Sequence, residues 1–131
     1  MGRTALALLM GLVLLLLAGC QLGGTPRLVV DPVVGREATV RLGERALLEI
    51  PIRNEGSAPL QIQDVMTSCG CTAASLTARE IPPGGQAILR VYFDSTFHNS
   101  TGTFRRQVFL TTNDPQAPQA QVEITVTVLE P

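Results

Sequence analysis

The sequence of 131 residues contains no tryptophan, a single histidine and three cysteines. An antibody-type domain is excluded, because such a domain packs a buried tryptophan against a disulfide between widely spaced cysteines. Hydrolase chemistry of the serine-histidine-aspartate kind has no support, because the one histidine, His98, stands in a polar connection without identifiable partners. Phosphate binding has no support either, since no glycine-rich loop joins a strand to a helix. The sequence therefore predicts a protein that is not an enzyme of these kinds.

Lysine is also absent, so the ten basic residues are all arginines. They are scattered along the chain, with only Arg105 and Arg106 adjacent. A nucleic-acid-binding domain carries its basic residues in a patch or stripe. We therefore expect no nucleic-acid partner.

Residues 1–19 are predicted to be a bacterial lipoprotein signal peptide. Arg3 forms a short basic region, a long apolar run follows, and the run ends in the lipobox pattern "LAGC" at residues 17–20. In this pattern the Cys20 thiol takes a diacylglyceryl group, and cleavage leaves Cys20 as the N-terminal residue. Two other interpretations stay open: an ordinary secretory signal with a chance cysteine, and an uncleaved membrane anchor.

The predicted lipid would decide where the protein works. Acyl chains such as palmitate contribute about 0.8 kcal/mol per buried CH₂, so two or more make attachment effectively permanent. We expect a protein of the cell envelope, held by lipid on the exported side of a bacterial membrane. Residues 20–26 would be the lipidated cysteine and a short Gly/Pro tether, and residues 27–131 the folded domain. The sequence leaves the membrane face open.

The folded part shows no amphipathic helical pattern and many short runs of period-two alternation, broken by Gly, Pro, Asn and Asp. About seven strands in a hundred residues predict an all-β fold, an immunoglobulin-like antiparallel β-sandwich, with a small β-barrel as the alternative. Pro51, inside one run, indicates an edge or bulge position. The expected strands are residues 28–31, 38–42, 46–54, 60–66, 86–94, 103–112 and 121–129.

The alternation also predicts the core. Each run places one set of apolar side chains on the inner face, and residue 65 or 66 is ambiguous within its run. The expected core residues are Leu48, Ile50, Ile52, Leu60, Ile62, Val65 or Met66, Leu89, Val91, Phe93, Val122, Ile124, Val126 and Val128.

Four short motifs occur in order at suitable spacing: "NEG" with Pro59-Leu60, "SCGCT" at residues 68–72, Pro83-Gly84, and "TND" at residues 112–114. Together they resemble the bacterial domain-of-unknown-function 1573 family, over about residues 45–127. The resemblance implies an immunoglobulin-like domain similar to the major sperm protein and hydin types, and many members are secreted or lipid-anchored. It implies no activity, because the family has no established one.

Three of these motifs are interpreted as turns. Gly56 is expected to supply a positive φ and Pro59 to set the entry to the next strand. Gly84 is expected to act in the same way before residue 86. The side chains of Asn113 and Asp114 are expected to bind nearby backbone N–H groups.

The motif "SCGCT" raises the question of chemistry. In a regular strand, Cys69 and Cys71 would lie about 6.6 Å apart between Cα atoms, whereas a disulfide prefers about 5.5–6 Å. Gly70 can bend the chain and close this gap. Such a bridge would be strained and easily reduced, and it would constrain almost no chain.

Four interpretations of Cys69 and Cys71 stay open. They are a local packing pair with or without a disulfide, an exposed redox pair, a soft-metal site for Cu(I) or Zn(II) with Met66 as a thioether ligand, and an intermolecular disulfide. His98 is expected to be a solvated loop residue. Two thiolates with one further donor are too few for a closed zinc site.

The sequence therefore favours a lipid-anchored, non-enzymatic binding or scaffolding module of the cell envelope, with an unidentified protein partner. The alternative is a thiol-based redox or Cu(I)-handling protein that acts through Cys69 and Cys71.

Overall fold

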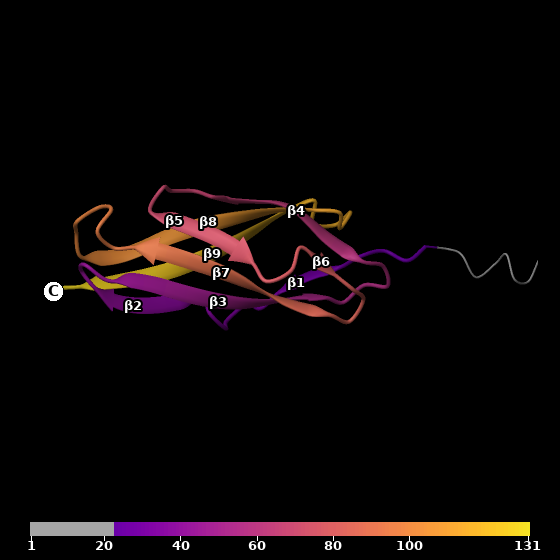
Figure 1. Cartoon of the computed structure of the whole chain (residues 1–131), viewed down its shortest axis with the longest axis horizontal. Coiled ribbons are helices and arrows are strands. Elements are labelled where there is room, and N and C mark those ends of the chain that lie inside the picture. The colour runs from indigo at the N-terminus through magenta and orange to yellow at the C-terminus, as the bar shows by residue number, and fades with distance from the viewer. Residues whose placement is uncertain (1–22) are drawn as a thin grey trace, which may run out of the picture.

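The computed structural model describes residues 23–131, which form two sheets packed face to face (Figure 1). The four-stranded sheet has the order β1 (Leu28–Val30), β3 (Arg45–Asn54), β7 (Gln86–Asp94), β5 (Thr72–Leu76). The five-stranded sheet has the order β2 (Glu37–Arg41), β9 (Gln119–Leu129), β8 (Gly102–Thr112), β4 (Leu60–Thr67), β6 (Glu80–Ile81). The predicted immunoglobulin-like sandwich is confirmed. Within residues 23–131, no helix is long and apolar enough to cross a membrane.

The seven expected strands are present, and two short ones, β5 and β6, were missed. β5 has the sequence "TAASL", in which small and polar residues give no apolar alternation, and β6 has two residues. One strand pair departs from the predicted antiparallel arrangement, because β2 runs parallel to β9. Alternation predicts that a segment is a strand but carries no information about the direction of its partner.

The core lies between the sheets and consists of the inward residues of both. Ile50, Ile52, Leu89 and Ile124 are completely buried, as the alternation predicts. Phe93 is the largest fully buried side chain. Burying a side chain of this size stabilises the fold by about 1.5–3 kcal/mol, and the core takes the place of the cross-sheet disulfide of antibody domains.

A bulge in β4 decides between the two ambiguous core residues. The register between β4 and β8 shifts between Ile62 and Asp64, which moves the following residues to the opposite faces. Val65 consequently packs against the core, whereas Met66 is 60% exposed.

Pro51 lies in β3, between β1 and β7, and its position explains why a proline is tolerated. Its carbonyl oxygen accepts a bond from the Asp31 N–H at 2.9 Å, at the end of the three-residue strand β1. The N and O atoms of one strand residue face the same neighbour, so the missing N–H of Pro51 falls where β1 stops pairing. The predicted edge or bulge position is therefore wrong, because β3 is an inner strand without a bulge, and the proline is tolerated because it stands just beyond the end of β1.

The turn after β3 is organised by Asn54, which is completely buried. Its amide donates to the carbonyl oxygens of Ala58 at 2.7 Å and Ile81 at 2.9 Å. Its Oδ1 accepts from the N–H groups of Gly56 at 3.0 Å and Arg27 at 3.1 Å. One side chain thus connects β3, its turn, β6 and the segment before β1.

The expected positive φ at Gly56 is wrong, because the backbone of Gly56 does not have a positive φ. Glycine is required there for close approach: a Cβ atom would lie 2.2 Å from the Thr25 carbonyl oxygen and 2.5 Å from the Arg27 nitrogen. Gly84 does have the expected positive φ of 75°. Asp114 also has the expected role, because its carboxylate accepts from the Leu28 N–H at 2.8 Å and the Gln116 N–H at 2.9 Å.

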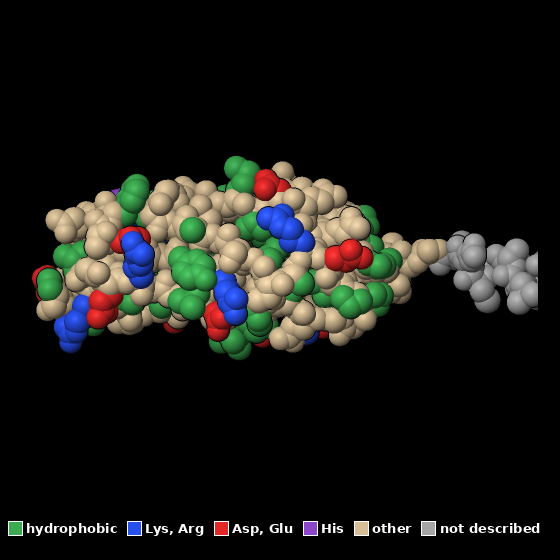
Figure 2. Space-filling model, viewed as in Figure 1, with side chains coloured by type: hydrophobic (Ala, Val, Ile, Leu, Met, Phe, Trp, Pro, Cys, Tyr) green, Lys and Arg blue, Asp and Glu red, His purple; other side chains and the backbone are tan. Residues whose placement is uncertain are grey.

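Charged side chains on the surface lie in small groups of opposite sign. Arg45 contacts Asp94 at 3.1 Å, and Arg90 contacts Glu49 at 2.9 Å. Figure 2 shows basic and acidic side chains side by side on the visible face, with hydrophobic side chains between them. Exposed pairs of this kind contribute about 0–1 kcal/mol each.

Candidate functional site

The "SCGCT" motif forms a tight turn that carries the chain from β4 in one sheet to β5 in the other. The Thr72 N–H donates to the Cys69 carbonyl oxygen at 3.1 Å and closes the turn. The Thr67 hydroxyl braces it by donating to the carbonyl oxygens of Thr72 and Cys69. This turn brings the Cα atoms of Cys69 and Cys71 to 5.2 Å, and the two residues form a disulfide. The turn therefore closes the gap that a regular strand would leave.

The two cysteines have different surroundings. Cys71 is 3% exposed and belongs to the core, and its sulfur lies 3.4 Å from the Thr72 hydroxyl. Cys69 is half-buried, and its sulfur accepts a bond from the Cys71 N–H at 3.1 Å. A reagent in solution can therefore approach Cys69 more easily than Cys71.

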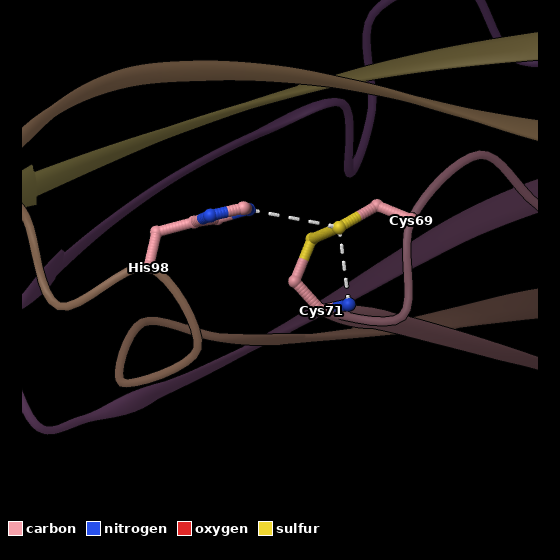
Figure 3. Close-up of side chains that lie close together, drawn as sticks. All are labelled: Cys69, Cys71 and His98. Carbon is pink, nitrogen blue, oxygen red and sulfur yellow. Dashed lines mark hydrogen bonds between the residues drawn. A yellow bond between two sulfur atoms is a disulfide. The ribbon is translucent and has the colours of Figure 1, made fainter.

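His98 lies beside the disulfide, although 29 positions separate it from Cys69 in the sequence. It comes from the loop between β7 and β8, and its Nε2 atom is 3.7 Å from the Cys69 sulfur (Figure 3). His98 is exposed in a loop, as expected. Its ring is not surrounded by solvent alone, however, because it faces the disulfide.

The loop that carries His98 is shaped at its start by Asp94. The Asp94 carboxylate accepts bonds from the Thr96 hydroxyl at 2.6 Å and the Thr96 N–H at 2.9 Å. The hydroxyl bond first, and then the backbone bond, hold the pKa of Asp94 below its usual value. The Asp94 N–H also donates to the Cys71 carbonyl oxygen at 2.9 Å, which ties the start of this loop to the cysteine turn.

Two aromatic rings set the orientation of the imidazole. Phe104 of β8 lies parallel to the His98 ring, with centroids 5.9 Å apart and an interplanar angle of 8°. Phe97 meets the same ring edge-on at 5.1 Å. Phe104 itself rests on Phe93 of the core at 5.7 Å, so the histidine is positioned by packing that extends into the sandwich.

Arg106 of β8 supplies a positive charge to the site. Its Nε donates to the Cys71 sulfur at 3.2 Å, its Nη2 lies 3.2 Å from His98 Nε2, and its guanidinium stands 5.3 Å from the Phe104 ring centre. Sequence reasoning missed Arg106, but a signal was present. Arg106 occupies an inward position of β8, in line with Phe104 and Val108, where an apolar residue is expected.

The contact between Arg106 and His98 defines the histidine tautomer. A guanidinium group donates hydrogen bonds and cannot accept them. Because Nη2 of Arg106 faces Nε2 of His98, Nε2 must be the acceptor, and the ring proton of the neutral imidazole lies on Nδ1. The lone pair of Nε2 is therefore directed into the site.

The sequence model of the DUF1573 family, described as a protein of unknown function, matches residues 36–128. The chain belongs to this family. The resemblance drawn from the four motifs is thus confirmed, and the matched range contains the disulfide, His98 and Arg106. No curated protein matches the sequence.

Several solved structures share the fold of this DUF1573 domain. A protein of unknown function from Porphyromonas gingivalis W83 has a TM-score of 0.70 and 26% identity, with 79% of this chain and 47% of that chain covered. This chain thus spans about half of that protein. The ASH/PapD-like domain 7 of human CEP192 has a TM-score of 0.60 and 8% identity, with 82% and 88% covered. The Vibrio cholerae VesB protease has a TM-score of 0.57 and 12% identity, with 77% and 31% covered. The last two likenesses show the fold alone.

Among the described residues, the sequence also singled out Met66 as a possible ligand. Met66 is on the exposed face of β4 after the bulge. In the described part of this DUF1573 chain, the ligand atoms that converge are those of Cys69, Cys71 and His98, which lie within 4.8 Å of one another. Cys20 lies outside the described residues.

Proposed function

We propose that this protein is a membrane-anchored module of the bacterial envelope whose Cys69–Cys71 disulfide accepts electrons from the thiols of a partner protein. One observation carries the proposal: the disulfide has a half-buried sulfur toward solvent and a buried sulfur in contact with the Arg106 guanidinium. This geometry favours the redox interpretation over a purely scaffolding role.

A stabilising role for the bridge is weak on physical grounds. The disulfide joins residues two positions apart. Loop-closure entropy grows with loop length, and a loop this small corresponds to roughly 1.5 kcal/mol, compared with about 3 kcal/mol for a 15-residue loop. Apart from Cys71, the core cluster consists of aliphatic side chains and Phe93 from both sheets.

Arg106 supports the electron-accepting direction. When the disulfide opens, the sulfur of Cys71 becomes a thiolate in an otherwise apolar position. A cation in contact with a thiolate stabilises it, and a disulfide whose reduced form is stabilised is a stronger oxidant. The guanidinium is already in place in the disulfide form, so little rearrangement is needed when the charge appears.

The reaction is a dithiol–disulfide exchange. A partner thiolate attacks the Cys69 sulfur, the Cys69–Cys71 bond breaks, and Cys71 leaves as a thiolate beside Arg106. The second partner thiol loses its proton and attacks the partner sulfur in the mixed disulfide, which releases Cys69. The partner ends with a disulfide, and this protein gains two electrons. Cys69 takes up one proton, Cys71 stays a thiolate beside Arg106, and the second proton that the partner loses passes to solvent.

The surface beside the disulfide offers a partner protein a groove and a strand edge. A shallow groove beside the disulfide is lined by Gly70, Cys71, Thr72, Tyr92 and Asp94. β5 begins at Thr72 and forms the outer edge of its sheet, where an extended segment can add by backbone hydrogen bonds. The binding role that the sequence favours is thus the recognition step of the exchange.

We predict that Arg106→Met slows reduction of the protein by a peptide dithiol about tenfold, because about 1.4 kcal/mol of thiolate stabilisation is lost. The reduction potential should fall by about 30 mV. The detergent-extracted full chain is used, and its thiols are counted against a Cys69→Ser/Cys71→Ser variant. Arg105→Met, with the same charge change on the outer face of β8, is the matched control. Equal rates for wild type and Arg106→Met would contradict the proposed role of Arg106, and absence of new thiols in wild type would contradict the exchange.

The anchor is the second part of the proposal. The described chain begins at the end of the sandwich opposite the C-terminus, whereas the turn before β5 and the loop between β7 and β8 lie toward the C-terminal end (Figure 1). A lipid on Cys20 would therefore leave the disulfide turned away from the membrane.

We predict that Cys20→Ala moves the protein from the membrane fraction to the soluble fraction and abolishes labelling by a fatty-acid analogue. Substituting Cys69 or Cys71 with serine should leave both results unchanged, because neither sulfur is in the lipobox. Continued lipid labelling of Cys20→Ala would contradict the anchor.

A further inference from the structure

The reduced form of the site brings together three donors that share a preference for soft metal ions. We propose that Cys69 Sγ, Cys71 Sγ and His98 Nε2 bind one Cu(I) ion when the disulfide is reduced. The inference depends on the proposed function only in requiring that the disulfide can be opened.

The distances suit a single ion. Nε2 of His98 is 3.7 Å from the Cys69 sulfur, and the three ligand atoms lie within 4.8 Å of one another. For zinc, sulfur bonds of about 2.3 Å and nitrogen bonds of about 2.0–2.1 Å place a sulfur and a nitrogen ligand about 3.5–3.8 Å apart at tetrahedral to trigonal angles, and we expect similar spacings for copper. The distance between His98 Nε2 and the Cys69 sulfur therefore already suits a shared ion, and the Cys71 sulfur must move away from the Cys69 sulfur when the disulfide opens.

The tautomer of the histidine also suits metal binding. Its Nε2 lone pair faces the site, as the contact with Arg106 requires. Its ring is held parallel to Phe104, which restricts rotation away from the sulfurs. On copper binding, Nη2 of Arg106 gives up its contact with His98, while Nε can keep its contact with Cys71.

Charge and ligand number select the metal. Two thiolates carry two negative charges, and Arg106 with a monovalent cation carries two positive ones, so the site with Cu(I) is neutral. A divalent zinc ion would leave a net positive charge in a partly buried position. A structural zinc site also takes four protein ligands, whereas the converging group in residues 23–131 has three. Thiolates and imidazole are ligands that copper accepts, and soft thiolates favour Cu(I).

Copper binding and the disulfide exclude one another at this site, because both use the same two sulfur atoms. The disulfide has no thiolate to offer, so a dithiol or a phosphine must first supply two electrons. Cu⁺ then binds to the two thiolates, and any proton still on a sulfur passes to solvent.

The test uses the detergent-extracted full chain, reduced with a phosphine without oxygen and titrated with Cu(I) against a chromophoric chelator. We expect one Cu(I) per wild-type chain above the level of Cys69→Ser/Cys71→Ser, and an affinity at least tenfold lower for His98→Ala. Met66→Leu is the matched control, since it removes the thioether that the sequence suggested, and its affinity should equal that of wild type. X-ray absorption should show two sulfur ligands and one nitrogen ligand.

Each other outcome overturns the inference. Equal copper in wild type and the double serine variant would show that the cysteines do not bind it. If His98→Ala keeps the wild-type affinity for Cu(I) and Met66→Leu loses it, the third ligand is Met66, and the site proposed here is refuted. Two new thiols without copper would refute the metal site and leave the exchange function standing. No new thiols after phosphine would refute both.

Discussion

Replacing Asn54 with alanine is expected to lower the free energy of unfolding by about 3–5 kcal/mol, because the side chain makes four hydrogen bonds from a fully buried position. Each bond contributes about 1 kcal/mol, and alanine leaves the Ile81 carbonyl oxygen, which is buried, without its partner. Water cannot easily replace a donor at that depth. Urea denaturation of wild type and variant measures the difference.

Asn113→Ala is the matched control for this prediction. Asn113 also bridges two backbone groups, accepting from the Gln61 N–H at 2.8 Å and donating to the Pro59 carbonyl oxygen at 3.1 Å, but it does so at the surface. Water can satisfy the groups it leaves, so the loss should be about 1 kcal/mol. Similar small losses in both variants would contradict the view that Asn54 organises this end of the sandwich.

Replacing Gly35 with alanine is expected to destabilise the protein by about 2–5 kcal/mol. Gly35 has a φ of 72°, which costs an alanine about 1–2 kcal/mol. A Cβ atom there would also lie 2.0 Å from the Glu49 carbonyl oxygen of β3, and backbone at that distance must move. Overpacking of this kind adds about 1–3 kcal/mol. Thermal or urea unfolding gives the measurement.

Gly84→Ala separates the two contributions. Gly84 has nearly the same φ, 75°, but a Cβ atom there would meet nothing within 4 Å. Gly84→Ala should therefore lower the free energy of unfolding only by the cost of a positive φ to an alanine, about 1–2 kcal/mol. If both alanine variants lose the same stability, the close approach of the loop between β1 and β2 to β3 contributes nothing.

Local patterns predicted the strands well and failed where a pattern was interrupted. The run from Val122 to Val128 alternates without a break, and its inward residues are buried as expected. In β4 the bulge shifts the phase by one residue, so Val65 instead of Met66 faces the core. A single inserted residue is invisible in the alternation until the partner strand is known.

The candidate site was predictable in part. If the predicted lipobox is correct, the oxidising compartment that it would imply leaves Cys69 and Cys71 as a pair, and this reasoning needs no structure. His98 and Arg106 are 29 and 35 positions from the cysteines they contact, so no spacing rule connects them. Arg106 could have been noticed, because a charged residue among inward apolar positions of a strand needs a buried partner.

The sequence by itself determined the fold class, most of the core faces and the family, because these follow from local alternation and from turn residues that act on their neighbours. It also determined that two cysteines stand two positions apart. Only the tertiary structure decided what surrounds them: the packing of the sheets brings the loop after β7 and an inward arginine of β8 against the turn before β5. Those contacts depend on which strands pair and at what register, and such long-range geometry is not written in any single stretch of the chain.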